Sequence, residues 1–301
     1  MSEHFISFLI VSNREPISSK YSLFLSFWPI YKMWVFTSGE HAMSTIDFIE
    51  NHRSIRKYKK KNIDPKILEK ILSAGTRAST SGNMQAYSII VTTEPSLKQK
   101  LLPLHFNQEM VVEAPALITF CGDFHRMRRW LEQRQAPANF DNFMSFMIAT
   151  IDATLVSQNV ALAAEGEGLG VCYLGTTLAN CENIGDALNL PPHVIPVVGF
   201  AIGYPDEVPD KRDRLPLEAI VHHETYQDYT NVEILNMYAR KEKTGWERYN
   251  SLPELKKLIE KEGVTNLAQI YTKVKYTKSS HHQYSNTVLN YLQAQQFMEN
   301  G

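Results

Sequence analysis

The stretch from Phe143 to Gly168 limits the possible folds of this chain more than any other feature of its sequence. Its side chains are apolar or small on nearly every side, and only Asp152 and Glu165 are clearly charged. A helix that is apolar all round is buried, either in a large core or against a second subunit. The stretch therefore predicts a long, buried helix in one of these two settings.

Four other runs predict the strands of a sheet. They are rich in β-branched or aliphatic residues and cover residues 87–93, 116–122, 171–175 and 194–202. The run over 116–122 is apolar without interruption, which is typical of a sheet with both faces covered. Helices are expected around these strands, over residues 64–75, 95–105, 123–130 and 181–188 and in the region after residue 231.

The composition is that of a soluble protein with a core. Of the 301 residues, 44% are hydrophobic and 21% are charged, which is ordinary for a globular protein. A net charge of −1 leaves no basic excess and argues against a nucleic-acid surface. The cysteines Cys121, Cys172 and Cys181 form no C-x-x-C motif and lie in or beside apolar runs. We therefore expect buried, reduced thiols in a cytoplasmic protein.

The first 42 residues differ from the rest of the sequence. They contain two apolar bursts without a regular period, and Pro29 and Lys32 interrupt the longer burst. That burst is shorter than the ~20 apolar residues needed to span a bilayer. We interpret residues 1–42 as an extension outside the fold, either a disordered tail or the product of a mis-assigned start; a membrane role is the alternative. The expected organisation is a core over residues 43–230 and a C-terminal helical extension over residues 231–301.

A basic cluster follows the first predicted helix. His52, Arg53, Ser54 and Arg56 place three groups that can be cationic and one hydroxyl within little more than one helical turn. Charged donors beside a neutral donor suit a phosphate group. The alternative is a solvated surface turn, because the basic charge continues through Lys61.

A polar loop over residues 76–85 is a second candidate site. Its hydroxyl and amide groups, among them those of Thr80, Ser81, Asn83 and Gln85, can face the polar edge of a ring. They can also belong to a turn that satisfies its own backbone. In an extended backbone Asn83 and Gln85 point to the same side, which favours a ligand site.

A third candidate site is a loop rich in proline and charge that contains Arg212, Asp213 and Arg214. In an extended loop the two arginines converge on one anion and Asp213 points away. A solvated charge run is the alternative.

Two other motifs are rejected, and one stretch is left open. The glycine run over residues 166–170 closes a helix and opens a strand, the reverse of a dinucleotide-binding fingerprint. His222, His223 and Glu224 have no second cluster of matching spacing, so no metal site is expected. Residues 131–143 are either a mobile flap or a packed surface loop.

Together these motifs resemble the flavin-dependent nitroreductase family, in particular its branch of NADPH-flavin oxidoreductases and oxygen-insensitive NADPH nitroreductases. The resemblance rests on residues 52–56, 78–85, 168–175, 203–205, 212–216 and 221–222. It implies an α+β fold with three α-β-α layers. A mixed, mostly antiparallel central sheet would be flanked by helices and followed by the C-terminal helical extension.

The resemblance also implies an FMN site. The implied cofactor-binding residues are His52, Arg53, Ser54, Arg56, Thr80, Ser81, Asn83, Gln85, Gln108, Gly175, Thr176, Arg212 and Arg214. The two basic segments are expected to hold the phosphate and ribityl chain, and the polar loop to bond the ring edge. Arg56 is implied near the pyrimidine end, where a cation eases reduction of the flavin. Relatives commonly have Lys-Pro-Arg where this chain has Arg212, Asp213 and Arg214, so both cations are kept.

The activity implied by the resemblance is that of an FMN-dependent NAD(P)H oxidoreductase, a cytoplasmic homodimer with FMN at its interface. NADPH or NADH is expected to deliver hydride to flavin N5 in a ping-pong cycle, before a nitroaromatic, a quinone or free flavin takes its place. The cofactor carries this chemistry, so no side-chain nucleophile is required. Lys273, Lys275 and Lys278 are either contacts of the NADPH 2′-phosphate or a solvated helix end.

Three alternatives remain at this level. The protein could bind or store FMN without catalysis, be a specialised flavin enzyme with one narrow substrate, or lack a flavin altogether.

Overall fold

The structure is a computed structural model that describes residues 44–299. The predicted extension over residues 1–42 lies outside the described residues. The residues from Thr45 onward belong to one compact unit.

The core contains a four-stranded sheet in the order β1-β2-β4-β3. Its strands are β1 (Tyr87–Thr92), β2 (Ala116–Asp123), β3 (Gly170–Tyr173) and β4 (Val194–Gly203). The four predicted strands are confirmed. All three strand pairs are antiparallel, so this sheet contains none of the parallel pairing that a mixed sheet would have.

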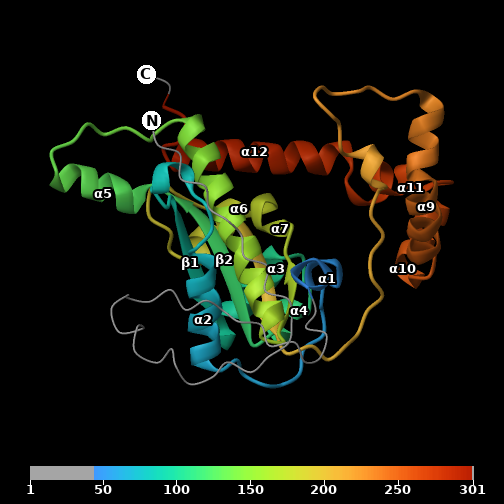
Figure 1. Ribbon diagram of the computed structural model, residues 1–301, viewed down its shortest axis with the longest axis horizontal. Helices are drawn as coiled ribbons and strands as arrows, with labels where there is room; N and C mark the ends of the chain where they lie inside the picture. Colours follow the sequence, from blue (N-terminus) through green and yellow to red (C-terminus); the bar gives the residue numbers. More distant parts are fainter. Residues whose placement is uncertain (1–43, 300–301) are drawn as a thin grey trace, which may run out of the picture. The chain divides into compact units, whose positions relative to one another are not determined.

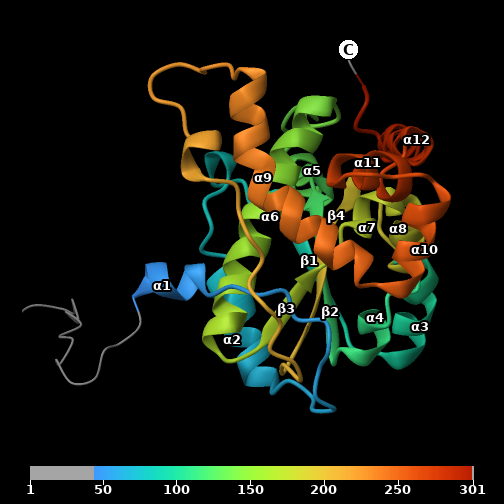
Figure 2. The same ribbon diagram turned by 90° about the vertical axis from the view of Figure 1, so that its right-hand side faces the viewer.

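Helices cover both faces of the sheet and form three layers, which Figure 2 shows from the side. The helices α2 (Pro65–Gly75) and α6 (Phe143–Gly166) share one hydrophobic cluster with the sheet. The helices α3 (Pro95–Leu104), α4 (Met110–Glu113) and α8 (Cys181–Ala187) contribute to a second cluster on the other face. The predicted three-layer α+β architecture is confirmed.

The long helix α6 lies across the sheet and is buried on one face (Figure 1). Its N-cap is Asn142, whose side chain accepts a hydrogen bond from the Ser145 N–H. The opposite face exposes Phe143, Met147, Ile151 and Leu155, which follow the i, i+4 spacing of one helix stripe, together with Met144. Among the described helices, α6 alone is long and apolar enough to cross a membrane, and it packs on the sheet as a core helix does.

The remaining described elements are short or lie towards the C-terminus. They are α1 (Thr45–Glu50), η1 (Ser81–Asn83), α5 (His125–Gln133), α7 (Thr176–Ala179), η2 (Leu217–Ala219), α9 (Asn231–Asn250), α10 (Pro253–Lys261), α11 (Leu267–Gln269), η3 (Ile270–Lys275) and α12 (Lys278–Ala294). The helices α9, α10, α11 and η3 bury a third cluster of their own, and α12 packs against α7 and α8.

Two local predictions can be resolved. Phe140 stacks on Phe124 with ring centroids 4.7 Å apart, and the Arg128 guanidinium donates to the Asn139 carbonyl. The stretch after α5 is therefore a packed surface loop. The three cysteines are free and buried, as expected.

Candidate functional site

The basic segment after α1 is fixed to the ends of β3 and β4. The Ile55 N–H donates to the Val171 carbonyl over 2.9 Å. The Tyr58 hydroxyl donates to the carbonyls of Ile55 and Ala201, over 2.6 and 3.0 Å. Burial raises the pKa of Tyr58, so its hydroxyl stays protonated and keeps both bonds.

A carboxylate from the loop after β4 holds the same segment from the other side. Glu207 Oε1 accepts hydrogen bonds from the N–H groups of Arg56 and Lys57, at 2.5 and 3.0 Å. The Lys57 carbonyl in turn accepts from the Asp206 N–H. These bonds fix the backbone of Arg56, and its side chain lines a cavity.

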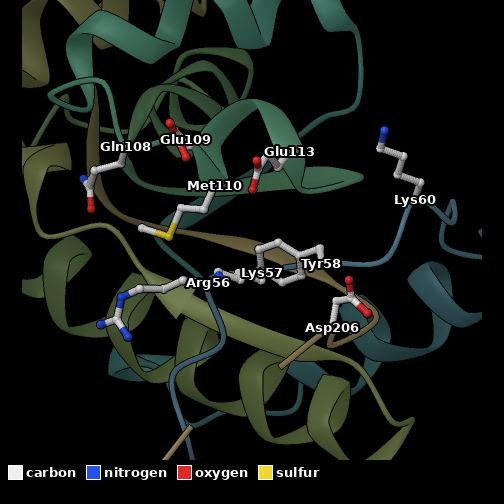
Figure 3. A pocket seen from close by; sticks show the side chains of 9 residues that line it. All are labelled: Arg56, Lys57, Tyr58, Lys60, Gln108, Glu109, Met110, Glu113 and Asp206. Atoms are coloured by element: carbon white, nitrogen blue, oxygen red, sulfur yellow. The ribbon is translucent and has the colours of Figure 1, made fainter. Parts of the chain in front are cut away.

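Arg56 and Gln108, both predicted site residues, line one cavity of about 530 Å³. Figure 3 shows the two side chains at the same end of this cavity, with the Met110 thioether between them. The other lining residues are Lys57, Tyr58, Lys60, Glu109, Glu113 and Asp206. The structure thus brings a cation and an amide from distant segments to one hollow.

Gly175 and Thr176, which follow β3 at the start of α7, belong to the same region. The Thr176 hydroxyl lies 2.8 Å from Nδ1 of the buried His105, and the Gln108 side-chain amide donates to the His105 carbonyl. Gly175 is exposed, and a Cβ added there would meet no atom within 4 Å. Open space therefore lies beside the backbone at Gly175.

Arg212 and Arg214 line a second cavity, of about 500 Å³, together with residues of α9. Its cationic residues are Lys211, Arg212, Arg214, Arg240, Lys241 and Arg248. Burial, together with the charges of Arg248 and Arg56, lowers the pKa of Arg212. The prediction that Asp213 points away is wrong: it lines the same cavity and accepts a hydrogen bond from Thr244.

His52, Arg53 and Ser54, the first residues of the basic segment, differ in their contacts. His52 Nδ1 lies 2.6 Å from Glu165 Oε1 at the C-terminal end of α6. Arg53 Nε is buried without a hydrogen-bond partner, while its Nη1 donates to the Asn51 carbonyl. Ser54 is half-buried beside them. The unpaired Nε of Arg53 is a donor available to a ligand.

The loop that contains Thr80, Ser81, Asn83 and Gln85 is not extended, so that part of the prediction is wrong. Residues 81–83 form η1, and both Asn83 and Gln85 have a φ of 55°. The two side chains nevertheless lie on one side, since Gln85 Nε2 is 3.4 Å from Asn83 Oδ1.

A buried carboxylate holds this loop in place. Asp152 of α6 is fully buried, and its two oxygens accept hydrogen bonds from the N–H groups of Ser81 and Ala86, at 2.9 and 3.1 Å. These two bonds bracket the loop. They compensate the left-handed backbone at Asn83 and Gln85, which costs free energy in residues other than glycine.

The two predicted halves of the site are attached to α6 at different points, one near the middle of the helix and one near its C-terminal end. Asp152 holds the polar loop and Glu165 contacts His52. At 1.5 Å of rise per residue, these two anchor points are about 20 Å apart along the helix. Within one chain, the structure does not bring the polar loop to the basic segment.

Residues 49–204 match the nitroreductase family. This stretch is more than half of the chain. The chain belongs to the nitroreductase family.

Individual relatives are similar to this chain over about three quarters or more of their own lengths. An FMN reductase (NADPH) of Bacillus subtilis is 35% identical over 190 residues, which are 62% of this chain and 76% of that protein. An oxygen-insensitive NADPH nitroreductase of Salmonella typhimurium is 34% identical, over 61% of this chain and 75% of its own length. A crystal structure of a Bacteroides fragilis protein described as an oxidoreductase superposes with a TM-score of 0.77 and 45% identity, covering 84% of this chain and all of that one.

Sequence reasoning missed the residues that hold these candidate segments in place: His105, Asp152, Glu165 and Glu207. A signal for two of them was present, because Asp152 and Glu165 are the clear charges of an otherwise apolar helix. A charge in such a setting is expected to have a structural partner. The sequence does not show which residues are the partners of Asp152 and Glu165.

Proposed function

We propose that this protein is an FMN-dependent NAD(P)H oxidoreductase of the nitroreductase family. The relatives named FMN reductase (NADPH) and NADPH nitroreductase support this activity. The observation that carries the proposal is the meeting of four distant segments around the ends of β3 and β4: residues 52–58, 105–110, 170–176 and 204–207. Together they contribute cations and amides to one region.

The donor set fits FMN. The buried, unpaired Nε of Arg53 and the guanidinium groups of Arg212 and Arg214 suit a phosphate. The open space at Gly175 allows a flat ring to approach the backbone. We therefore assign the phosphate and ribityl chain to His52, Arg53, Ser54, Arg212 and Arg214.

The chemistry comes from the cofactor, which when bound accepts and passes on hydride. Arg56 tunes that chemistry electrostatically, because a fixed cation near the pyrimidine end stabilises the negative charge that reduction creates. Gln108 and Thr176 orient the ring edge. The cycle is ping-pong, with NADPH or NADH as hydride donor and a nitroaromatic, a quinone or free flavin as acceptor.

The working unit is a homodimer in which the polar loop of one copy completes the site of the other. Two observations support this arrangement: the separation of about 20 Å between the two anchor points on α6, and the exposed apolar stripe on the same helix. Thr80, Ser81, Asn83 and Gln85 would then bond the polar edge of a flavin held by the other copy. The buried, free cysteines support a cytoplasmic location.

The residues proposed to contact the nicotinamide cosubstrate are three lysines of η3 and the start of α12. Lys273, Lys275 and Lys278 are exposed, and Lys275 Nζ lies 5.1 Å above the ring of Tyr249. They remain candidates for the 2′-phosphate of NADPH.

An absorption spectrum of the purified protein tests the proposal. We expect the bands of bound, oxidised flavin, a melting temperature that rises with added FMN, and rapid bleaching by anaerobic NADPH. Flavin that binds but bleaches slowly would indicate a non-catalytic FMN protein. Colourless protein with no response to FMN would refute both readings.

A further inference from the structure

His105 connects two residues of the proposed FMN site that come from different parts of the chain. It follows the last residue of α3 and is 3% exposed. Its ring Nδ1 lies 2.8 Å from the Thr176 hydroxyl, and its carbonyl accepts a hydrogen bond of 2.9 Å from the Gln108 side chain. One residue therefore restrains both a backbone segment beside the cofactor and the amide opposite it.

A second contact ties the same two segments together. The Asn180 side-chain amide donates to the Leu104 carbonyl over 2.6 Å. The C-terminal end of α3 is thus bonded twice to residues 176–180. These two bonds restrain α7, the helix that begins directly after the exposed Gly175.

The ring of His105 is neutral in the folded protein, because burial lowers its pKa to about 4. A neutral imidazole has one N–H donor and one acceptor nitrogen. The Thr176 hydroxyl can donate or accept, so the bond to Nδ1 survives in either tautomer. A neutral ring also adds no charge next to Thr176 and Gln108.

We propose that His105 is a positioning residue for the flavin: its ring fixes the Thr176 hydroxyl beside the isoalloxazine site, while its main-chain carbonyl, which any residue here would offer, holds the Gln108 amide. This inference rests on the proposed function. In a purely structural role, His105 would only pack against the hydrophobic cluster that contains the neighbouring Leu101. The two roles predict different outcomes when the ring is replaced.

Three variants separate these roles. His105→Leu removes the bond to Thr176, whereas His105→Asn keeps a polar atom near the position of Nδ1. Leu101→Ala is the matched structural control, because Leu101 is 1% exposed and lies in α3, the helix that ends just before His105. For each variant we would measure the melting temperature, the FMN dissociation constant, and the rate of flavin reduction by NADPH at saturating FMN.

We expect His105→Leu to weaken FMN binding about 5- to 10-fold, the effect of one neutral hydrogen bond, and to slow flavin reduction. His105→Asn should recover most of both losses. Leu101→Ala should lower the melting temperature while leaving the dissociation constant and reduction rate near their wild-type values.

A double-mutant cycle with Thr176→Val adds a second criterion. If His105 acts through the Thr176 hydroxyl, the two substitutions together should cost little more than either alone. Wild-type FMN affinity and reduction rate in His105→Leu, or equal effects of Leu101→Ala, would overturn the inference. Wild-type protein that fails to bind or reduce FMN would instead refute the proposed function.

Discussion

Several polar side chains of this site act on main-chain groups, so the residues left to face the cavity are few. The Tyr58 hydroxyl donates to two carbonyls, and the Glu207 carboxylate accepts from two N–H groups. Both hold the backbone around Arg56. The Arg56 side chain is exposed and contacts its own segment only through a 3.5 Å bond to the Ser54 carbonyl, so its charge can act on a ligand.

Arg56→Leu should slow reduction of the bound flavin by NADPH about tenfold or more, because the cation that stabilises the reduced ring is lost. The FMN dissociation constant should change less, since the phosphate contacts remain. Stopped-flow reduction at saturating FMN measures the rate. Arg56→Lys keeps the charge and serves as the control; a wild-type rate in Arg56→Leu would disprove the role of this residue.

The buried His105 makes stability depend on pH. Its pKa is about 4 in the folded protein and 6.5 when unperturbed, so the unfolded chain binds a proton in this interval and the folded protein does not. Its contribution to the free energy of unfolding is therefore present at pH 7 and decreases as the pH falls towards 4. Between pH 7 and pH 5 the expected loss is about 2 kcal/mol.

Urea unfolding of wild type and His105→Asn at these two pH values tests this dependence. The variant should lose about 2 kcal/mol less than wild type over the interval. His193, whose pKa is also lowered by burial, contributes equally to both proteins. Identical pH slopes would contradict the assignment.

At the scale of elements, α6 is both a core helix and the support of the site. Its buried face packs on the sheet, while Asp152 reaches the polar loop and Glu165 reaches His52. The loop geometry therefore depends on a helix that is far away in the sequence.

Asp152→Asn should loosen the loop. A carboxylate accepts both N–H groups, whereas an amide offers one oxygen and turns its NH₂ group towards the other donor. We expect a loss of about 1–3 kcal/mol in the free energy of unfolding, together with faster hydrogen exchange at Ser81 and Ala86. Thr154→Ala, at an exposed position of the same helix, is the control. Unchanged exchange at both amides would rule out the bracket.

The helices and strands of this protein could be predicted because their signals are local. The caps, the glycine stops and the apolar runs lie within the elements that they define. The predicted conformation of the polar loop was wrong because Asp152, the residue that holds the loop, is 71 residues from Ser81 in the sequence. The His52–Glu165 contact, across 113 residues, was missed for the same reason. Local patterns identified the candidate residues, and long-range partners decide how they are held.

At the scale of the whole molecule, the proposed dimer divides each site between two copies. The basic segment belongs to one copy and the polar loop to the other. Within one copy, a substitution in the basic segment should therefore damage one site of the dimer, and a substitution in the polar loop should damage the other site.

Mixed dimers test this division. Arg214→Ala and Gln85→Ala, each impaired as a homodimer, would be co-expressed with different tags and purified as heterodimers. If sites are shared, one site of each heterodimer has both intact halves, and about half of the wild-type activity should return. If both halves belong to the same chain, no intact site forms and activity stays at the level of the single variants. Loss of the dimer in Ile151→Asp, measured by sedimentation, provides an independent check of the α6 stripe.

Because both half-sites are attached to α6, this helix sets the distance between them. Each copy would present its loop to one flavin and its basic segment to the other, at a separation set by the number of turns between residues 152 and 165. A single inserted residue between these positions would turn the far attachment by about 100° and shift it by about 1.5 Å. The length of this helix would thus fix the spacing between the two cofactors.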